Sequence, residues 1–143
     1  MSVTHYWRRS TELPEKPFAR AVTDCEKLLG ELGVALGGFD GTGQPIFDTD
    51  HIVFNGAHGQ HGEAFEISRV EFDRRGRAEV RSFCKTEHLP YDMCVKVCLV
   101  ILKHHLGDGI TVTTDALDVD WADAIDAVHQ SLGYGRGFSL ETR

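Results

Sequence analysis

The sequence contains no apolar run long enough to cross a membrane. Its longest such run, Val97 to Leu102, falls far short of the roughly 20 residues that a bilayer requires. Residues 1–20 also lack the apolar core of a signal peptide, because charged side chains interrupt them throughout. We therefore expect a cytoplasmic protein without membrane contacts.

Cysteine motifs and segments that divide domains are missing as well. No CxxC pair occurs among the scattered cysteines, which predicts reduced thiols rather than a disulfide framework or a metal site of the usual spacing. No internal repeat is visible, and no linker is long enough to separate domains. The 143 residues predict one globular domain, 1–143, with an extended lead-in over 1–13 and a mobile tail over 134–143.

Positive charge is in short supply. The formal net charge is -7, which argues against bulk binding of nucleic acid, since such binding depends on Lys and Arg neutralising phosphates. One local exception is a group of arginines in the middle of the chain. It is either a basic patch or, the interpretation that we favour, a solvated turn. The group comprises Arg69, Arg74, Arg75, Arg77 and Arg81.

The hydrophobic pattern predicts helices at both ends and strands between them. Apolar residues recur at steps of three and four over 17–32, as in an amphipathic helix, and again after Asp120. A hairpin is expected across 40–43, followed by strands at 51–55, 64–72 and 79–84 that form an antiparallel meander. A further strand is expected at 110–114.

The most apolar segment is the helix expected over 90–106. It is apolar almost all round, which predicts burial on most sides, either beneath another helix or in a homodimer interface. The predicted fold class is therefore α+β: a single domain in which this long helix and the N- and C-terminal helices pack against an antiparallel sheet.

Four short motifs support a resemblance. In order along the chain they are Phe54-Asn55-Gly56, Glu63-Ala64-Phe65, Phe83-Cys84-Lys85-Thr86 and Pro90-Tyr91-Asp92. With them, residues 52–121 resemble a family of small uncharacterised bacterial and phage proteins. The resemblance implies a phage-related protein and carries no activity with it.

The polar residues of these motifs predict a ligand site where a strand ends and a helix begins. Such a junction exposes polar groups above a rigid core. Free amides and a lysine would receive an anionic or nucleotide-like ligand, or a protein partner, with a tyrosine stacking on it. Asn55, the only asparagine in the chain, either holds a turn or binds the ligand. The predicted site residues are Asn55, Glu63, Lys85, Thr86, Tyr91 and Asp92.

Three other interpretations of the same region stay open. Cys84 is a candidate nucleophile with His88 or His61 as its base, since a thiolate needs a basic neighbour. His58, His61 and Glu63 are candidate metal ligands, completed by Cys84 or His51. Alternatively the junction is purely structural, with an ion pair between Lys85 and Asp92, Thr86 at the start of the turn and Tyr91 as a lid.

From these observations we expect a non-enzymatic binding or interaction module that needs no cofactor. The alternative is a small hydrolase or transferase that uses Cys84 or a metal held by His58, His61 and Glu63.

Overall fold

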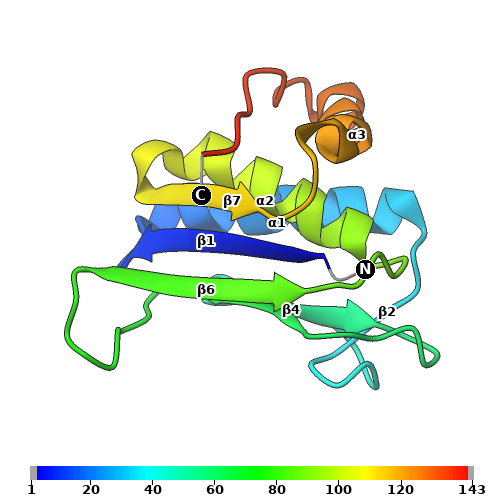
Figure 1. Ribbon diagram of the computed structural model, residues 1–143, viewed down its shortest axis with the longest axis horizontal. Helices are drawn as coiled ribbons and strands as arrows, with labels where there is room; N and C mark the ends of the chain where they lie inside the picture. Colours follow the sequence, from blue (N-terminus) through cyan, green and yellow to red (C-terminus); the bar gives the residue numbers. More distant parts are fainter. Residues whose placement is uncertain (1–2, 142–143) are drawn as a thin grey trace.

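Two antiparallel sheets and three α-helices make up residues 3–141, the part of the chain that the structure describes (Figure 1). This computed structural model confirms the predicted α+β class. The helices are α1 (Glu15–Leu32), α2 (Asp92–Leu106) and α3 (Ala122–Leu132). The strands are β1 (Thr4–Ser10), β2 (Leu36–Gly37), β3 (Ile46–Phe47), β4 (His51–Gly56), β5 (Phe65–Ser68), β6 (Glu79–Lys85) and β7 (Ile110–Thr114).

The first sheet has the order β6-β1-β7, so the strand nearest the start of the chain lies at its centre. The sequence predicted only an extended lead-in here. The period of two is hidden because the core-facing positions of β1 include polar residues, namely the fully buried His5 and Arg9, beside the buried Trp7. The intervening residues, Tyr6 and Arg8, lie on the other face of the sheet.

The second sheet is built around β4, and its pairing corrects two predictions. The expected hairpin between 34–39 and 46–47 does not form, because β2 and β3 each pair with β4 instead of with one another. Nor does β6 pair back onto β5: it pairs with β1, while β5 pairs with β4. The continuous meander was wrong because the sequence did not reveal β1, which pairs with β6 and makes it part of a separate sheet.

Helix α2 is buried within this single chain. Its apolar residues pack on α1, on α3 and on the adjacent strand β7 (Figure 1). The predicted burial on most sides is therefore met without a second subunit, and the homodimer stays a prediction without that support. The helix begins at Asp92 rather than Pro90. No helix in residues 3–141 is long and apolar enough to span a membrane.

The C-terminal segment packs closely on the helices, which the expected mobile tail over 134–143 did not foresee. The Tyr134 hydroxyl donates to Asp24 Oδ2 at 2.5 Å, and the Phe138 ring stacks on Trp121 with centroids 5.3 Å apart. The Glu141 amide donates to the Val112 carbonyl at 2.9 Å. Residues 142–143 lie outside the described part of the chain.

The two sheets are joined by hydrogen bonds at both ends. At one end the Glu63 amide donates to the Lys85 carbonyl at 3.2 Å. At the other, the buried Arg9 guanidinium donates to the Arg69 carbonyl at 2.8 Å and pairs with Glu71 at 3.0 Å. Burial lowers the pKa of Arg9, and the Glu71 carboxylate opposes that shift. The first contact joins β6 to the residues before β5, and the contacts of Arg9 join β1 to the residues after β5.

Candidate functional site

The strand-to-helix junction is a tightly bonded turn. The Thr86 amide donates to the Val3 carbonyl at 2.9 Å, and the Asp92 amide donates to the Leu89 carbonyl at 2.8 Å. Between them, Glu87 and His88 both adopt the left-handed conformation, with φ of 57° and 60°. Two consecutive non-glycine residues in this region persist only where the surrounding contacts hold them.

Asp92 is the centre of a buried polar network. Its Oδ1 accepts from His5 Nε2 at 2.6 Å and from the Thr86 hydroxyl at 2.5 Å, while Lys96 Nζ lies 3.1 Å from Oδ2. Burial alone would raise the pKa of the Asp92 carboxyl. The hydrogen bonds from His5 and Thr86, with the charge of Lys96, hold that pKa well below its usual value instead.

The partners of Asp92 differ from those that the sequence suggested. The predicted ion pair with Lys85 does not form: Lys85 Nζ lies 3.4 Å from Glu87, and Lys96 pairs with Asp92. The histidine that contacts Asp92 is His5, whereas His88 is exposed. No local signal could identify His5, because 87 positions separate it from Asp92.

Tyr91 and Cys84 converge on one carbonyl. The fully buried Tyr91 hydroxyl donates to the Glu63 carbonyl at 2.6 Å, and Cys84 Sγ lies 3.2 Å from the same oxygen. Burial raises the pKa of Tyr91 and raises that of the Cys84 thiol to about 12. The Cys84 side chain is fully buried, and a thiol with so high a pKa forms almost no thiolate near neutral pH. Both facts argue against Cys84 as a nucleophile.

Asn55 uses all of its hydrogen-bonding capacity on the backbone. Its Oδ1 accepts from the amides of Gly56 and Gly62 at 2.8 and 3.1 Å. Its Nδ2 donates to the carbonyls of Phe39 and Gly62, each at 3.0 Å. An amide side chain offers two donors and two acceptor lone pairs, so none remains for a ligand. Asn55 therefore holds the loop over 56–62.

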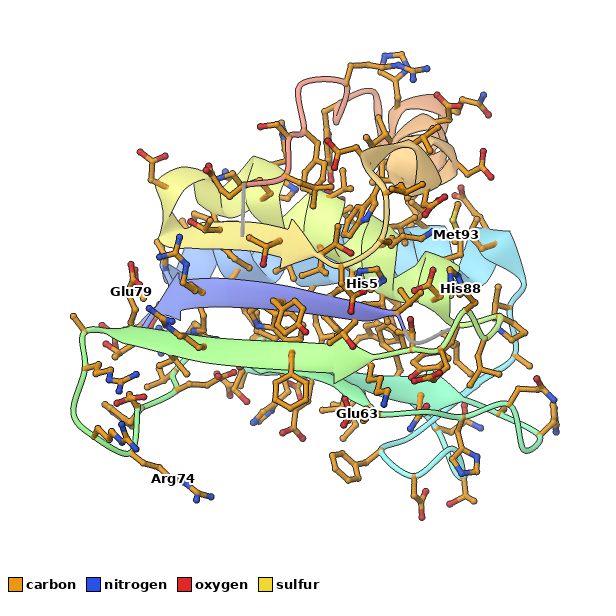
Figure 2. All side chains as sticks on the ribbon, viewed as in Figure 1. His5, Glu63, Arg74, Glu79, His88 and Met93 are labelled. Carbon is orange, nitrogen blue, oxygen red and sulfur yellow. The ribbon has the colours of Figure 1, made fainter. Side chains whose placement is uncertain are left out.

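Only Glu63 and Lys85 among the six predicted ligand-binding residues have exposed side chains. Glu63 Oε1 accepts from the Lys85 amide at 2.8 Å, beside the end of β6 (Figure 2). The structure does bring all six residues into one region. Asn55, Thr86, Tyr91 and Asp92 are buried there and bonded to their neighbours, so they explain the shape of the junction without a ligand.

The candidate metal ligands do not form a metal site. Across residues 3–141, no three His, Cys, Asp or Glu side chains come together as a set that could hold a metal ion. His51 lies 3.3 Å from Asp48 in the turn before β4. His58 and His61 sit instead on the glycine-rich loop, where they border an open hollow with Asp40.

The outer face of the first sheet carries a group of exposed and half-buried side chains that the sequence did not single out. We call Tyr6, Arg8, Arg81 and Phe83 the open sheet face. They line a shallow hollow of about 610 Å³. Phe83 is 59% exposed although it is a large aromatic residue in the middle of a strand, and its ring centroid lies 6.3 Å from that of Tyr6. The alternation in β6 was a usable signal, because its odd-numbered residues, Glu79, Arg81, Phe83 and Lys85, are all exposed.

The strand register places the two aromatic residues of this face opposite each other, and likewise its two arginines. Lys85 bonds through its amide and carbonyl to Glu63, on the side of β6 away from β1. Thr4 likewise bonds to Asp115, on the side away from β6. The backbone groups of Thr4 and Lys85 therefore point away from each other, and the same holds for every second residue pair along β1 and β6. Such non-hydrogen-bonded pairs bring the facing side chains closest together. These pairs are Thr4–Lys85, Tyr6–Phe83 and Arg8–Arg81.

The two arginines of the open sheet face differ in their partners. Arg8 lies 3.5 Å from Glu79 in an exposed ion pair. Arg81 has no ion-pair partner within residues 3–141. Like charges that face each other on neighbouring strands destabilise a sheet. This face is therefore suited to an anion that lies between the two guanidinium groups, next to an exposed aromatic ring.

A second hollow lies on the other side of Phe83. Phe39, His61 and Glu63 line it, together with the buried Asn55. Phe83 borders both hollows, so the open sheet face continues toward the loop that Asn55 holds.

Comparisons of the chain with family models, with curated proteins and with solved structures found no match. The resemblance to the family with the FNG, FCKT and PYD motifs therefore stays a prediction, and any function has to be argued from the geometry.

Proposed function

We propose that the protein is a non-enzymatic binding module and that it binds a nucleotide-like anionic ligand on the open sheet face. The ligand class is the one that the sequence predicted, but its place differs. The junction from Cys84 to Asp92 supports the end of β6, and the neighbouring outer face of the same strand receives the ligand.

The observation that carries the proposal is the pairing of Arg8 with Arg81 beside the pairing of Tyr6 with Phe83. Two guanidinium groups hold a phosphate through charge-assisted hydrogen bonds. An exposed aromatic ring provides a surface on which a base stacks. A nucleotide carries a phosphate and a base on one small molecule. The arginine pair and the aromatic pair are only two residues apart along the strand, so one nucleotide can reach both.

A protein partner was the other ligand class that the sequence predicted. Arginine and tyrosine are also frequent at protein interfaces. However, Arg81 has no ion-pair partner within residues 3–141 and faces the like charge of Arg8. A compact anion would neutralise Arg81, whereas an apolar protein surface would not. The nucleotide-like ligand is therefore the better match.

Calorimetric titration with adenosine, guanosine, cytidine and uridine monophosphates at low ionic strength tests this proposal. We expect saturable binding and a higher thermal midpoint, since a ligand bound only by the folded state stabilises it. Phe83→Leu keeps an apolar side chain but removes the ring, so it should weaken binding by roughly 5-fold to 100-fold, the range for one stacked base. Arg81→Gln should weaken binding about tenfold or more.

The matched control is Arg136→Gln. Arg136 is also exposed, but it pairs with Asp126 near α3, away from the open sheet face. Its replacement should leave the affinity unchanged. The proposal is overturned if none of the four nucleotides binds, or if Phe83→Leu and Arg81→Gln bind as tightly as Arg136→Gln.

A further inference from the structure

We infer that the ligand of the open sheet face is a single-stranded nucleic acid of several nucleotides, which follows β6 from Phe83 to a turn rich in arginine. This inference rests on the proposed function and extends it from a nucleotide to an oligomer. We call Arg74, Arg75 and Arg77 the arginine turn. It lies directly before β6, at the opposite end of the strand from Glu63 (Figure 2).

The arginine turn has a defined shape. Asp73 Oδ2 accepts from the amides of Arg75 and Arg77 at 2.9 and 3.1 Å. Gly76 adopts a φ of 73°, which a side chain would disfavour. Asp73 thus organises the backbone. These backbone bonds, with the positive charges of Arg77 and Arg75, lower the pKa of its carboxyl, although desolvation opposes that shift. The three guanidinium groups are left exposed at the surface.

Positive charge is concentrated on the open sheet face and the arginine turn, although the net charge of the chain is -7. The open sheet face and the arginine turn together contain five of the ten arginines of the chain. Residues 73–81 contain four arginines and two carboxylates, so this segment has a positive net charge while the whole protein has a negative one. None of the three arginines of the turn has a salt bridge in the part of the chain that the structure describes. A polyanion would be attracted to this edge and repelled elsewhere.

The length of the path requires more than one nucleotide. From Phe83 to Glu79 the strand covers about 13 Å, at about 3.3 Å per residue. Phosphates lie about 3.4 Å apart along a strand whose bases are stacked, and further apart where the bases are unstacked. The path therefore spans more than one phosphate and at most about four. Phe72, directly before the turn, is 79% exposed and offers another ring at the far end of this path.

A strand with unstacked bases fits this surface better than a duplex does. Aromatic platforms beside a cationic path bind single strands, because every base has a face that can stack. The bases of a duplex are already stacked on one another and cannot reach Phe83. The expected binding is therefore selective for single strands, tolerant of sequence and strongly dependent on salt.

Fluorescence anisotropy with labelled single-stranded oligomers of 2, 4, 8 and 12 nucleotides tests the inference on the whole chain. RNA, DNA and a 12-base-pair duplex form the separate arms. We expect affinity to rise with length up to at least 4 nucleotides and the duplex to bind at least tenfold more weakly than the single strand. A difference between the RNA and DNA arms would identify which of the two sugars the site prefers, and either sugar agrees with the inference.

The decisive variant replaces Arg74, Arg75 and Arg77 together by glutamine. It should weaken binding of the 8-nucleotide strand at least tenfold. It should also reduce the slope of log affinity against log salt by about 2, because each phosphate that is no longer neutralised lowers that slope by roughly 0.7. Binding of a mononucleotide should not change. Arg20→Gln and Arg136→Gln are exposed controls outside this path, and both should bind as the parent does.

Two failures are distinguishable. If mononucleotides bind but oligomers bind no tighter, or if the triple variant leaves the salt slope unchanged, this inference is wrong and the proposed function stands. If neither mononucleotides nor oligomers bind, both are wrong. An unchanged circular dichroism spectrum and thermal midpoint of the triple variant would show that it folds normally.

Discussion

The junction after β6 and the outer face of β6 use neighbouring residues of one strand in opposite ways. At the junction, Thr86, Tyr91 and Asp92 are buried and bonded to one another or to the backbone. On the open sheet face, Arg81 and Phe83 are exposed, and Arg8 lies opposite a like charge. Polar groups whose bonds are complete stabilise the fold, whereas groups left exposed beside like charges are the ones that gain from a ligand.

Among the variants that compare the junction with the open sheet face, the largest loss of stability is expected for a change at Asp92. Asp92→Ala leaves Lys96 and the buried His5 without their shared carboxylate, and it should lower the free energy of unfolding by about 3 to 5 kcal/mol. Urea denaturation measures this loss. Arg81→Ala on the open sheet face should change the same quantity by no more than about 0.5 kcal/mol. Equal losses in the two variants would erase the distinction between the regions.

Acid should act selectively on the junction. The pKa of Asp92 is lowered in the folded state relative to the unfolded value of about 3.9, so its contribution to stability is present above that pH. As the pH falls below about 4 toward the folded pKa, the carboxylate takes up a proton and the contribution is lost. The difference in unfolding free energy between the parent and Asp92→Asn should therefore shrink from pH 5 to pH 2. A difference that stays constant over this range would mean that Asp92 is not the titrating group.

Tyr91 offers a smaller test within the junction. Tyr91→Phe keeps the buried ring but removes the hydroxyl that donates to the Glu63 carbonyl, so the expected loss is about 1 to 1.5 kcal/mol. Amides of the loop over 56–62 should exchange hydrogen faster, because this bond and those of Asn55 hold that loop. Nucleotide affinity should stay at the parental value, and a large loss of affinity would bring the junction back as the binding site.

The smallest change in stability is expected for Phe83→Leu. The ring is 59% exposed and its loss opens no cavity, so the free energy of unfolding should change by about 0.5 kcal/mol or less. The same variant should show the loss of nucleotide affinity described above. A substantial loss of stability would assign Phe83 to the core with the junction residues.

The sequence predicted what depends on local pattern. The helices, the burial of 90–106 and most strands follow from apolar periodicity and from breaks at glycine and proline. It did not reveal β1, because His5 and Arg9 put polar side chains on the core face, and their partners Asp92 and Glu71 are distant in the chain. For the same reason the sequence did not show that the polar residues of the junction bond to one another and to the backbone, since their partners are distant in the chain.

Only part of the open sheet face could be predicted from the sequence. The alternation of β6 marks Arg81 and Phe83 as outward residues once the strand is recognised. Their opposition to Arg8 and Tyr6 depends on the register with β1, and no local rule fixes a register between strands so far apart in the chain.

The central position of β1 also has a consequence for the rate of folding. Thr4 bonds to Asp115, 111 positions away, and β6 and β7 both pair with this early strand. Closing such long loops costs conformational entropy before any contact offsets it, and chains dominated by distant contacts fold slowly. During synthesis β1 has to wait until residue 114 has left the ribosome before both of its edges are paired. Its exposed backbone edges during that interval are where aggregation would begin.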